Sequence, residues 1–126
     1  MQKLLIEGTK ITPLISGDPE TGNIEISGRS IPENATGFYK PLMDWICAYK
    51  LQANSKTQLS FHLDYLNSIS QKIVYDILEQ MIEINEKSEL VILWKYDEDD
   101  EEILDEGKVF KSRFELDFRL VEVPDN

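Results

Sequence analysis

The sequence predicts an α/β (α+β) fold: a mixed β-sheet with an N-terminal hairpin and with helices mainly on one face. Two features carry this prediction. Several segments alternate apolar with polar residues, and after the hairpin each such segment is separated from the next by a stretch with helical spacing. Strands that alternate with helices pair in parallel through right-handed crossovers. Because three of the strands have one polar face, we expect the other side of the sheet to be solvated or open to a partner.

The N-terminal hairpin is indicated by short strands and a strong turn. Residues 3–8 and 13–17 are predicted to be strands. Residues 18–23 contain one Pro and one Gly, the residue types that preset φ and permit positive φ in tight turns. This turn leads into a predicted strand at 23–29, in which isoleucine alternates with polar residues.

Helices and strands then alternate to the end of the chain. The first predicted helix ends at about residue 51. Pro41 either kinks this helix or lies in the first turn of a new helix that begins there. A strand with one buried face at 59–65 precedes the most regular helix, which we expect to open at Ser68. The continuous apolar run at 90–94 predicts a central strand buried on both faces.

The last part of the chain is predicted to be an acidic loop, a short helix and a strand. Residues 97–102 are all acidic, and they lead into a helix that carries Ile103, Leu104 and Phe110. Apolar residues then alternate with charged ones over 114–120, which predicts the final strand.

Composition restricts the class of protein. The 126 residues suffice for one domain spanning 1–126, and a net charge of −11 makes nucleic-acid or membrane-surface binding a poor expectation. Cys47 is the single cysteine, so an internal disulfide and a cysteine-based metal cage are excluded. No signal peptide or membrane-length apolar run is apparent. We therefore expect a cytoplasmic protein without cofactor or metal.

Candidate catalytic residues are few. His62 is the single histidine, on the polar side of a predicted strand, and no acidic partner is tied to it by spacing. Cys47 lies between apolar neighbours on a helix, where a small buried side chain is the expected role. The acidic run does not match a calcium-binding loop, since its sixth and twelfth positions are Glu102 and Lys108. The residues give no argument for catalysis.

Ser68 is the most informative polar residue. It follows a strand end, and Ser68 and Gln71 have the spacing of a capping box, in which both side chains satisfy free N–H groups. The same position presents a hydroxyl at a positive helix end, where a phosphate group would be tolerated. An N-cap role and a regulatory role are therefore both open.

Several segments together resemble the SiaC family of bacterial regulatory phosphoproteins. Residues 26–35 read Ile-Ser-Gly-Arg-Ser-Ile-Pro-Glu-Asn-Ala, and residues 38–42 read Phe-Tyr-Lys-Pro-Leu. The Tyr-Leu-Asn-Ser-Ile-Ser-Gln-Lys stretch at 65–72 and the acidic loop at 96–102 are also similar to that family. These segments span most of the chain.

This resemblance implies a fold like that of the anti-sigma-factor antagonist (STAS) domains and a switch rather than an enzyme. In the family, a protein kinase phosphorylates a residue at a strand-to-helix junction and a PP2C-type phosphatase reverses the modification. The unmodified protein activates a diguanylate cyclase, which makes cyclic di-GMP and promotes biofilm formation. The family residue matching Ser68 is typically Thr, and the neighbouring hydroxyl residues are replaced here by Ile69 and Gln71. The phosphorylation candidates are therefore Ser68 and, second, Ser70.

Other residues are candidates for binding a partner: Arg29, Asn67, Asp99, Asp100 and Glu101. Arg29 has two interpretations, an ion pair with Glu33 or Asp64, or contact with a phosphate on Ser68 or with a partner. The acidic loop is either a solvated helix start or a docking site for a basic patch. The alternative to an adaptor is a domain that binds a small anionic ligand in a cleft near Arg29 and Ser68.

Overall fold

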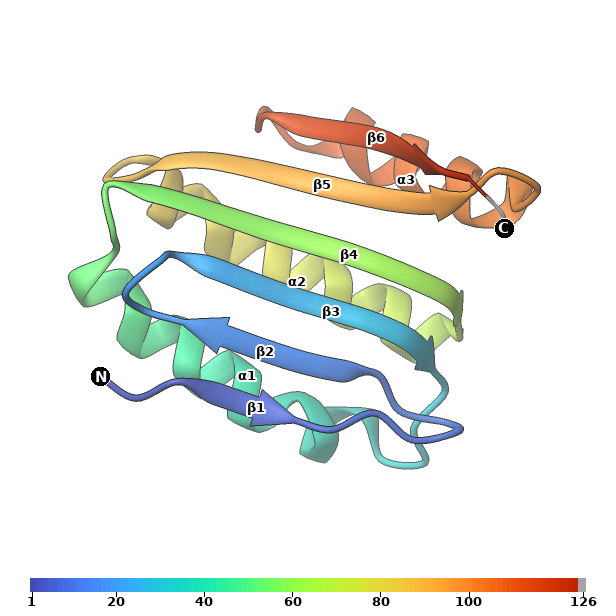
Figure 1. Ribbon diagram of the computed structural model, residues 1–126, viewed down its shortest axis with the longest axis horizontal. Coiled ribbons are helices and arrows are strands. Elements are labelled where there is room, and N and C mark those ends of the chain that lie inside the picture. The colour runs from blue at the N-terminus through green and yellow to red at the C-terminus, as the bar shows by residue number, and fades with distance from the viewer. Residues whose placement is uncertain (125–126) are drawn as a thin grey trace.

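Figure 1 shows one six-stranded sheet with all three α-helices on the same face, in a computed structural model that describes residues 1–124. The strands are β1 Leu4–Ile6, β2 Leu14–Asp18, β3 Asn23–Ser30, β4 Lys56–Leu66, β5 Glu89–Asp97 and β6 Phe118–Val123. The helices are α1 Ala35–Tyr49, α2 Ser68–Asn85 and α3 Glu101–Arg113, with a short 3-10 turn, η1 Lys50–Gln52, after α1.

The strands lie in the sheet in the same order as in the sequence. The first three pair antiparallel, and β3, β4, β5 and β6 pair in parallel. The parallel pairs are joined by α1, α2 and α3, as the alternation of strands and helices predicts. The predicted mixed sheet with an N-terminal hairpin and helices on one face is confirmed.

The core lies between the helices and one face of the sheet. Every second residue of the central strands is buried there, including Leu59 and Phe61 of β4 and Ile92 and Trp94 of β5. The Trp94 ring packs near the rings of Phe61 and two later phenylalanines, and its Nε1 donates to the Ile103 carbonyl at 2.8 Å. Complete burial of an apolar side chain stabilises a fold by about 1.5–3 kcal/mol, so these alternating residues hold the sheet to its helices.

Two details of the predicted elements were wrong, and one open alternative is decided. Strand β5 is not buried on both faces: Val91 and Leu93 are half-buried, because all three helices cover the opposite face. Of the two alternatives for Pro41, the structure has the one in which the helix contains it: Asn34 caps α1, which starts at Ala35. The last strand begins at Phe118, four residues later than the alternation indicates.

Candidate functional site

The candidate residues gather at one edge of the sheet. Strands β3, β4 and β5 are parallel, so their carboxyl ends and the loops that follow them lie at the same edge (Figure 1). Arg29 lies at the end of β3, Asn67 and Ser68 follow β4, and the acidic loop follows β5. The fold therefore brings together residues that are up to about seventy positions apart in the sequence.

The residue that caps α2 is Asn67. Its side-chain oxygen accepts from the Ser70 N–H at 2.9 Å, which makes Ser68 the first residue of the helix. The predicted capping box was therefore wrong. The Gln71 side chain does not turn back to the helix start but donates to Glu106 Oε1 of α3 at 2.8 Å. Asn67, a partner-binding candidate, thus has a structural role as the cap.

Ser68 presents an exposed hydroxyl at this cap. Within residues 1–124, neither the Ser68 hydroxyl nor the Ser68 and Ile69 N–H groups form a hydrogen bond with the protein. Such N–H groups at a helix start point outward and carry partial positive charge. A phosphate on Ser68 would meet free donors without disturbing an existing contact.

Ser70, the second candidate, lies inside the protein. It is 1% exposed, and its hydroxyl donates to the Ser30 carbonyl at 3.0 Å. The Ser30 hydroxyl lies 2.8 Å from Ser70 Oγ and 2.5 Å from the Tyr39 hydroxyl, and the Asn67 N–H also donates to the Ser30 carbonyl. This buried hydroxyl network ties the first turn of α2 to β3 and α1. Of the two serines, only Ser68 is accessible.

Arg29 lies beside Tyr65 at the same edge. Its guanidinium carbon is 5.6 Å from the centre of the Tyr65 ring, a cation–π contact. The ion pair with Glu33 or Asp64 is absent from residues 1–124. Tyr65 is 46% exposed and Ile69 is 58% exposed, so two large apolar side chains flank Ser68 in the sequence and reach solvent.

A groove of about 380 Å³ separates α2 from α3, with Ser68 in its wall. Tyr75, Val109 and Phe110 supply its apolar surface, and Lys72 and Arg113 supply a cation from each helix. Arg29 does not line this groove. The sequence suggested one cleft near Arg29 and Ser68. In the structure, the Arg29–Tyr65 pair and the groove beside Ser68 are separate.

Glu106 is the one acid in the groove wall. Its Oε1 accepts from Gln71, while Oε2 is buried with no partner among the described residues. Burial raises the pKa of the Glu106 carboxyl above its ordinary value, and the neighbouring Glu102 and Asp100 add to this. The folded protein therefore binds a proton here more readily than the unfolded chain does.

We expect Glu106→Gln to stabilise the protein at pH 7. Since the folded pKa is raised, ionising Glu106 costs stability as the pH climbs from 4.5, the unperturbed value, through the folded pKa. The gain should be below about 1 kcal/mol because solvent screens this half-buried group, and it should vanish below about pH 4. Urea denaturation at the two pH values measures it. An equal gain at both, or a similar gain for the exposed control Glu79→Gln, would contradict this origin.

The acidic loop forms the start of helix α3, which is one of the two interpretations of its sequence. Asp100 caps α3, its side chain accepting from the Ile103 N–H at 3.1 Å, and Glu101 lies in the first turn. Asp99 and Glu101 are exposed. No cluster of three or more metal-ligating side chains occurs within residues 1–124.

The matching family is that of the SiaC regulatory phosphoproteins, whose model covers residues 6–123. The chain belongs to the SiaC family. A protein of Pseudomonas aeruginosa (strain UCBPP-PA14) is 31% identical over 121 residues, which is 95% of this chain and 96% of that protein.

Solved SiaC structures have the same fold. SiaC of Pseudomonas aeruginosa superposes with a TM-score of 0.83 at 27% identity, covering 99% of this chain and all of that one. A chain in the crystal structure of the diguanylate cyclase SiaD in complex with its activator SiaC gives a TM-score of 0.84 at 27% identity, covering 97% of this chain and 99% of that one. In residues 1–124, no helix is long and apolar enough to cross a membrane.

In this member of the SiaC family, two side chains are in contact that spacing in the sequence did not predict to be partners. His62 Nε2 of β4 lies 3.0 Å from Asp97 Oδ1 of β5, on the face of the sheet without helices. The contact is diagonal, because the register places His62 opposite Lys95, two residues before Asp97. Cys47, predicted to be buried, is exposed on α1, where it lies outside the carboxyl-edge site.

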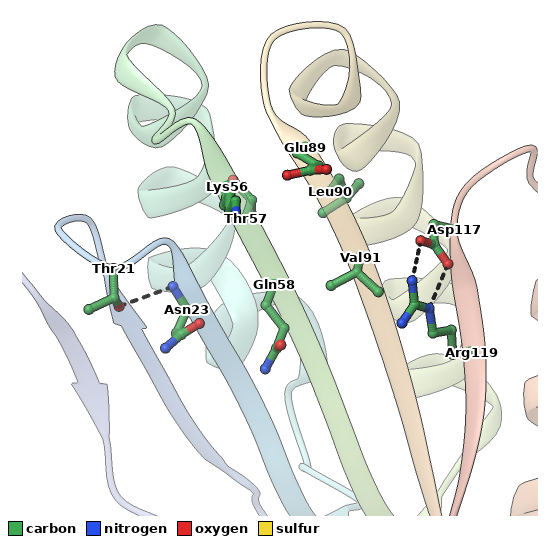
Figure 2. A pocket seen from close by; sticks show the side chains of 10 residues that line it. All are labelled: Thr21, Asn23, Lys56, Thr57, Gln58, Glu89, Leu90, Val91, Asp117 and Arg119. Carbon is green, nitrogen blue, oxygen red and sulfur yellow. Dashed lines mark hydrogen bonds and ion pairs between the residues drawn. The ribbon is translucent and has the colours of Figure 1, made fainter.

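The sheet of this chain also has a pocket at its opposite edge, where the parallel strands begin. Figure 2 shows the side chains that line it, among them Lys56, Glu89 and Arg119. The volume of the pocket is about 370 Å³. Arg119 is held by Asp117 through two hydrogen bonds of 3.0 and 2.9 Å. The lining carries two cations, Lys56 and Arg119, and two acids, Glu89 and Asp117, so the pocket has no excess positive charge to attract an anionic ligand.

Proposed function

We propose that this protein is a non-enzymatic adaptor that binds and activates a diguanylate cyclase, and that phosphorylation of Ser68 abolishes this binding. The observation that carries the proposal is the exposed Ser68 hydroxyl at a helix start whose N–H groups are free. The membership in a family of regulatory phosphoproteins supports it. So does the similarity to SiaC, which is the activator of SiaD in their complex.

A phosphate on Ser68 can act as a switch because of what surrounds it. The modification adds nearly two negative charges at neutral pH. The helix start tolerates them, and the buried hydroxyl network of Ser30 and Ser70 keeps this turn in place. A partner that packs on the exposed Tyr65 and Ile69 would have to desolvate the phosphate, which opposes binding. The fold persists while the surface changes.

The proposal implies two further protein partners. A protein kinase would modify Ser68, and a PP2C-type phosphatase would remove the phosphate. Both must reach an exposed helix start, as Ser68 allows. We propose that residues 1–126 act as one regulatory domain in the cytoplasm, controlling cyclic di-GMP and biofilm formation through the cyclase.

The alternative function, binding of a small anionic ligand near Arg29 and Ser68, has less support. Arg29 contacts Tyr65 and does not line the groove beside Ser68, so this groove lacks the arginine that the alternative function needs. Co-purification distinguishes the two functions. An adaptor retains a stoichiometric protein partner, whereas a ligand-binding domain retains an anion.

The direct test is cyclase activation. Unmodified protein should raise the rate of cyclic di-GMP synthesis by a purified diguanylate cyclase, and kinase-treated protein should not. Absence of binding and activation by the unmodified protein, with a cyclase from the same genome, would contradict the proposal.

We also expect the acidic loop to accelerate association with a basic partner. Replacing Asp99, Asp100 and Glu101 with Ser should lower the on-rate about tenfold at low salt, since exposed charges steer encounters and are screened within about 8 Å at physiological ionic strength. Serine at position 100 can still cap α3, so the fold should remain. Stopped-flow association at two salt concentrations measures the effect.

The matched control removes three acids elsewhere. Glu20, Glu25 and Glu89 are exposed and lie away from the loops that follow β3, β4 and β5. Replacing them with Ser changes the net charge equally. If this control slows association as much, net charge rather than the acidic loop is responsible.

A further inference from the structure

The start of α2 is linked to α3 through one side chain, that of Gln71. Gln71 is three residues after Ser68, so the two side chains are neighbours on the surface of α2, and both line the groove. The Gln71 amide donates to Glu106 Oε1 at 2.8 Å, and this is the one hydrogen bond between α2 and α3 among residues 1–124. The Glu106 carboxyl group is thereby held beside the helical turn that carries Ser68.

The negative charge of this carboxyl group is poorly compensated. Within residues 1–124, Glu106 Oε2 is buried without a hydrogen-bond partner, and Glu106 forms no salt bridge. Two acids at the start of its own helix, Asp100 and Glu102, act on it. Lys72 lines the groove from α2, and Arg113 lines it further along α3. Solvent screens a buried charge less than an exposed one, so a charge added nearby acts strongly on Glu106.

We propose that Glu106 is the proton-binding partner of the Ser68 phosphate, so that modification of Ser68 drives the uptake of one proton by the Glu106 carboxyl group. This inference rests on the proposed modification of Ser68. The phosphate brings nearly two negative charges to the turn beside Glu106, and a like charge at short range disfavours an ionised carboxylate. The proton comes from solvent and is carried by Oε2, while Oε1 keeps its hydrogen bond from Gln71. Gln71 is the positioning residue that keeps the two acidic groups close.

This coupling carries the effect of the phosphate from α2 to α3. Glu106 belongs to the helix that begins at the acidic loop, so loss of its charge relieves repulsion at that helix start. Because linkage between two sites is reciprocal, a protonated Glu106 favours the phosphate in turn. In the modified protein, Glu106 therefore ionises at a higher pH than in the unmodified protein, and the modified form gains relative stability as the pH falls.

The test uses the full chain with phosphoserine encoded at position 68, so that no kinase is needed. Carboxyl-carbon NMR titration follows Glu106, whose resonance is identified by its absence from Glu106→Gln. We expect the pKa of Glu106 to be higher by about 1 unit with phosphoserine than with serine at position 68. In a Gln71→Ala background the carboxyl group is free to turn away, so this difference should fall by at least about half.

Asp105 is the control within the same titration. It is exposed, precedes Glu106 on α3 and does not line the groove, so its pKa should move less than half as far. An unchanged Glu106 pKa, an equal rise at Asp105, or the same difference with and without Gln71 would refute the coupling and leave the switch at Ser68 standing. Cyclase binding by the phosphoserine protein is measured separately. Tight binding there would contradict the proposed function and leave the coupling result intact.

Discussion

Ser68→Ala, incubated with kinase and ATP, binds the cyclase as tightly as the unmodified protein, and Ser68→Asp binds about tenfold to a hundredfold more weakly. This is the expected result if the Ser68 junction is the switch. Alanine removes the hydroxyl that would receive the phosphate. It removes no hydrogen bond to the protein within residues 1–124, so the surface that binds the cyclase is kept but can no longer be phosphorylated. Aspartate places a charge between the exposed Tyr65 and Ile69, and a partner must desolvate it.

Both variants should fold. Asn67 supplies the cap of α2, so its first turn does not depend on the Ser68 side chain, and an acid in the first turn of a helix is favoured by the dipole. Circular dichroism checks the fold, titration against the cyclase gives the affinities, and mass spectrometry locates the phosphate. Equal affinities for the Ala and Asp variants, or phosphate on a residue other than Ser68, would contradict the switch.

The arrangement of the sheet could be predicted from periodicity. In β4 and β3, isoleucine, leucine and phenylalanine alternate with polar residues, and this period of two gives both the strand and its buried face. For strand β5, periodicity does not decide whether one face or both faces are covered by helices. Its continuous apolar run is the same whether helices cover one face or two, and only the position of all three helices leaves Val91 and Leu93 half-exposed.

The sequence predicted that the site lies at the start of α2, but it could not predict which residue caps the helix or which side chains pair. Asn67 and Ser68 are both good capping residues in adjacent positions, so local sequence cannot choose between them. The choice also depends on a tertiary contact, because the Gln71 side chain is engaged by Glu106, 35 residues away. The His62–Asp97 pair and the two-sided groove likewise require strand register and helix placement.

The burial of Ser70 had a signal in the sequence. Ser70 precedes Ile73, Val74 and Ile77 by three, four and seven positions, which places it on the buried stripe of α2. Ser68 lies outside that stripe. The helical period thus separates an accessible serine from a buried one, although both stand next to the same strand end.

Ser70→Asp should therefore destabilise the fold, whereas Ser68→Asp should leave the protein folded. The Ser70 side chain is buried and bonded to the Ser30 carbonyl, which can accept but not donate a hydrogen bond. A carboxylate there faces this acceptor and loses its hydration, and the neutral Ser30 hydroxyl, which donates to Ser70 Oγ at 2.8 Å, is no substitute for a cation. A buried charge without a cationic partner costs at least about 3 kcal/mol. Ser70→Ala, the matched control, removes the hydroxyl alone and should cost about 1–2 kcal/mol. Urea denaturation of the three variants gives the comparison. If Ser70→Asp were as stable as Ser68→Asp, the buried hydroxyl network would not hold the first turn of α2, and Ser70 would again be a candidate for the phosphate.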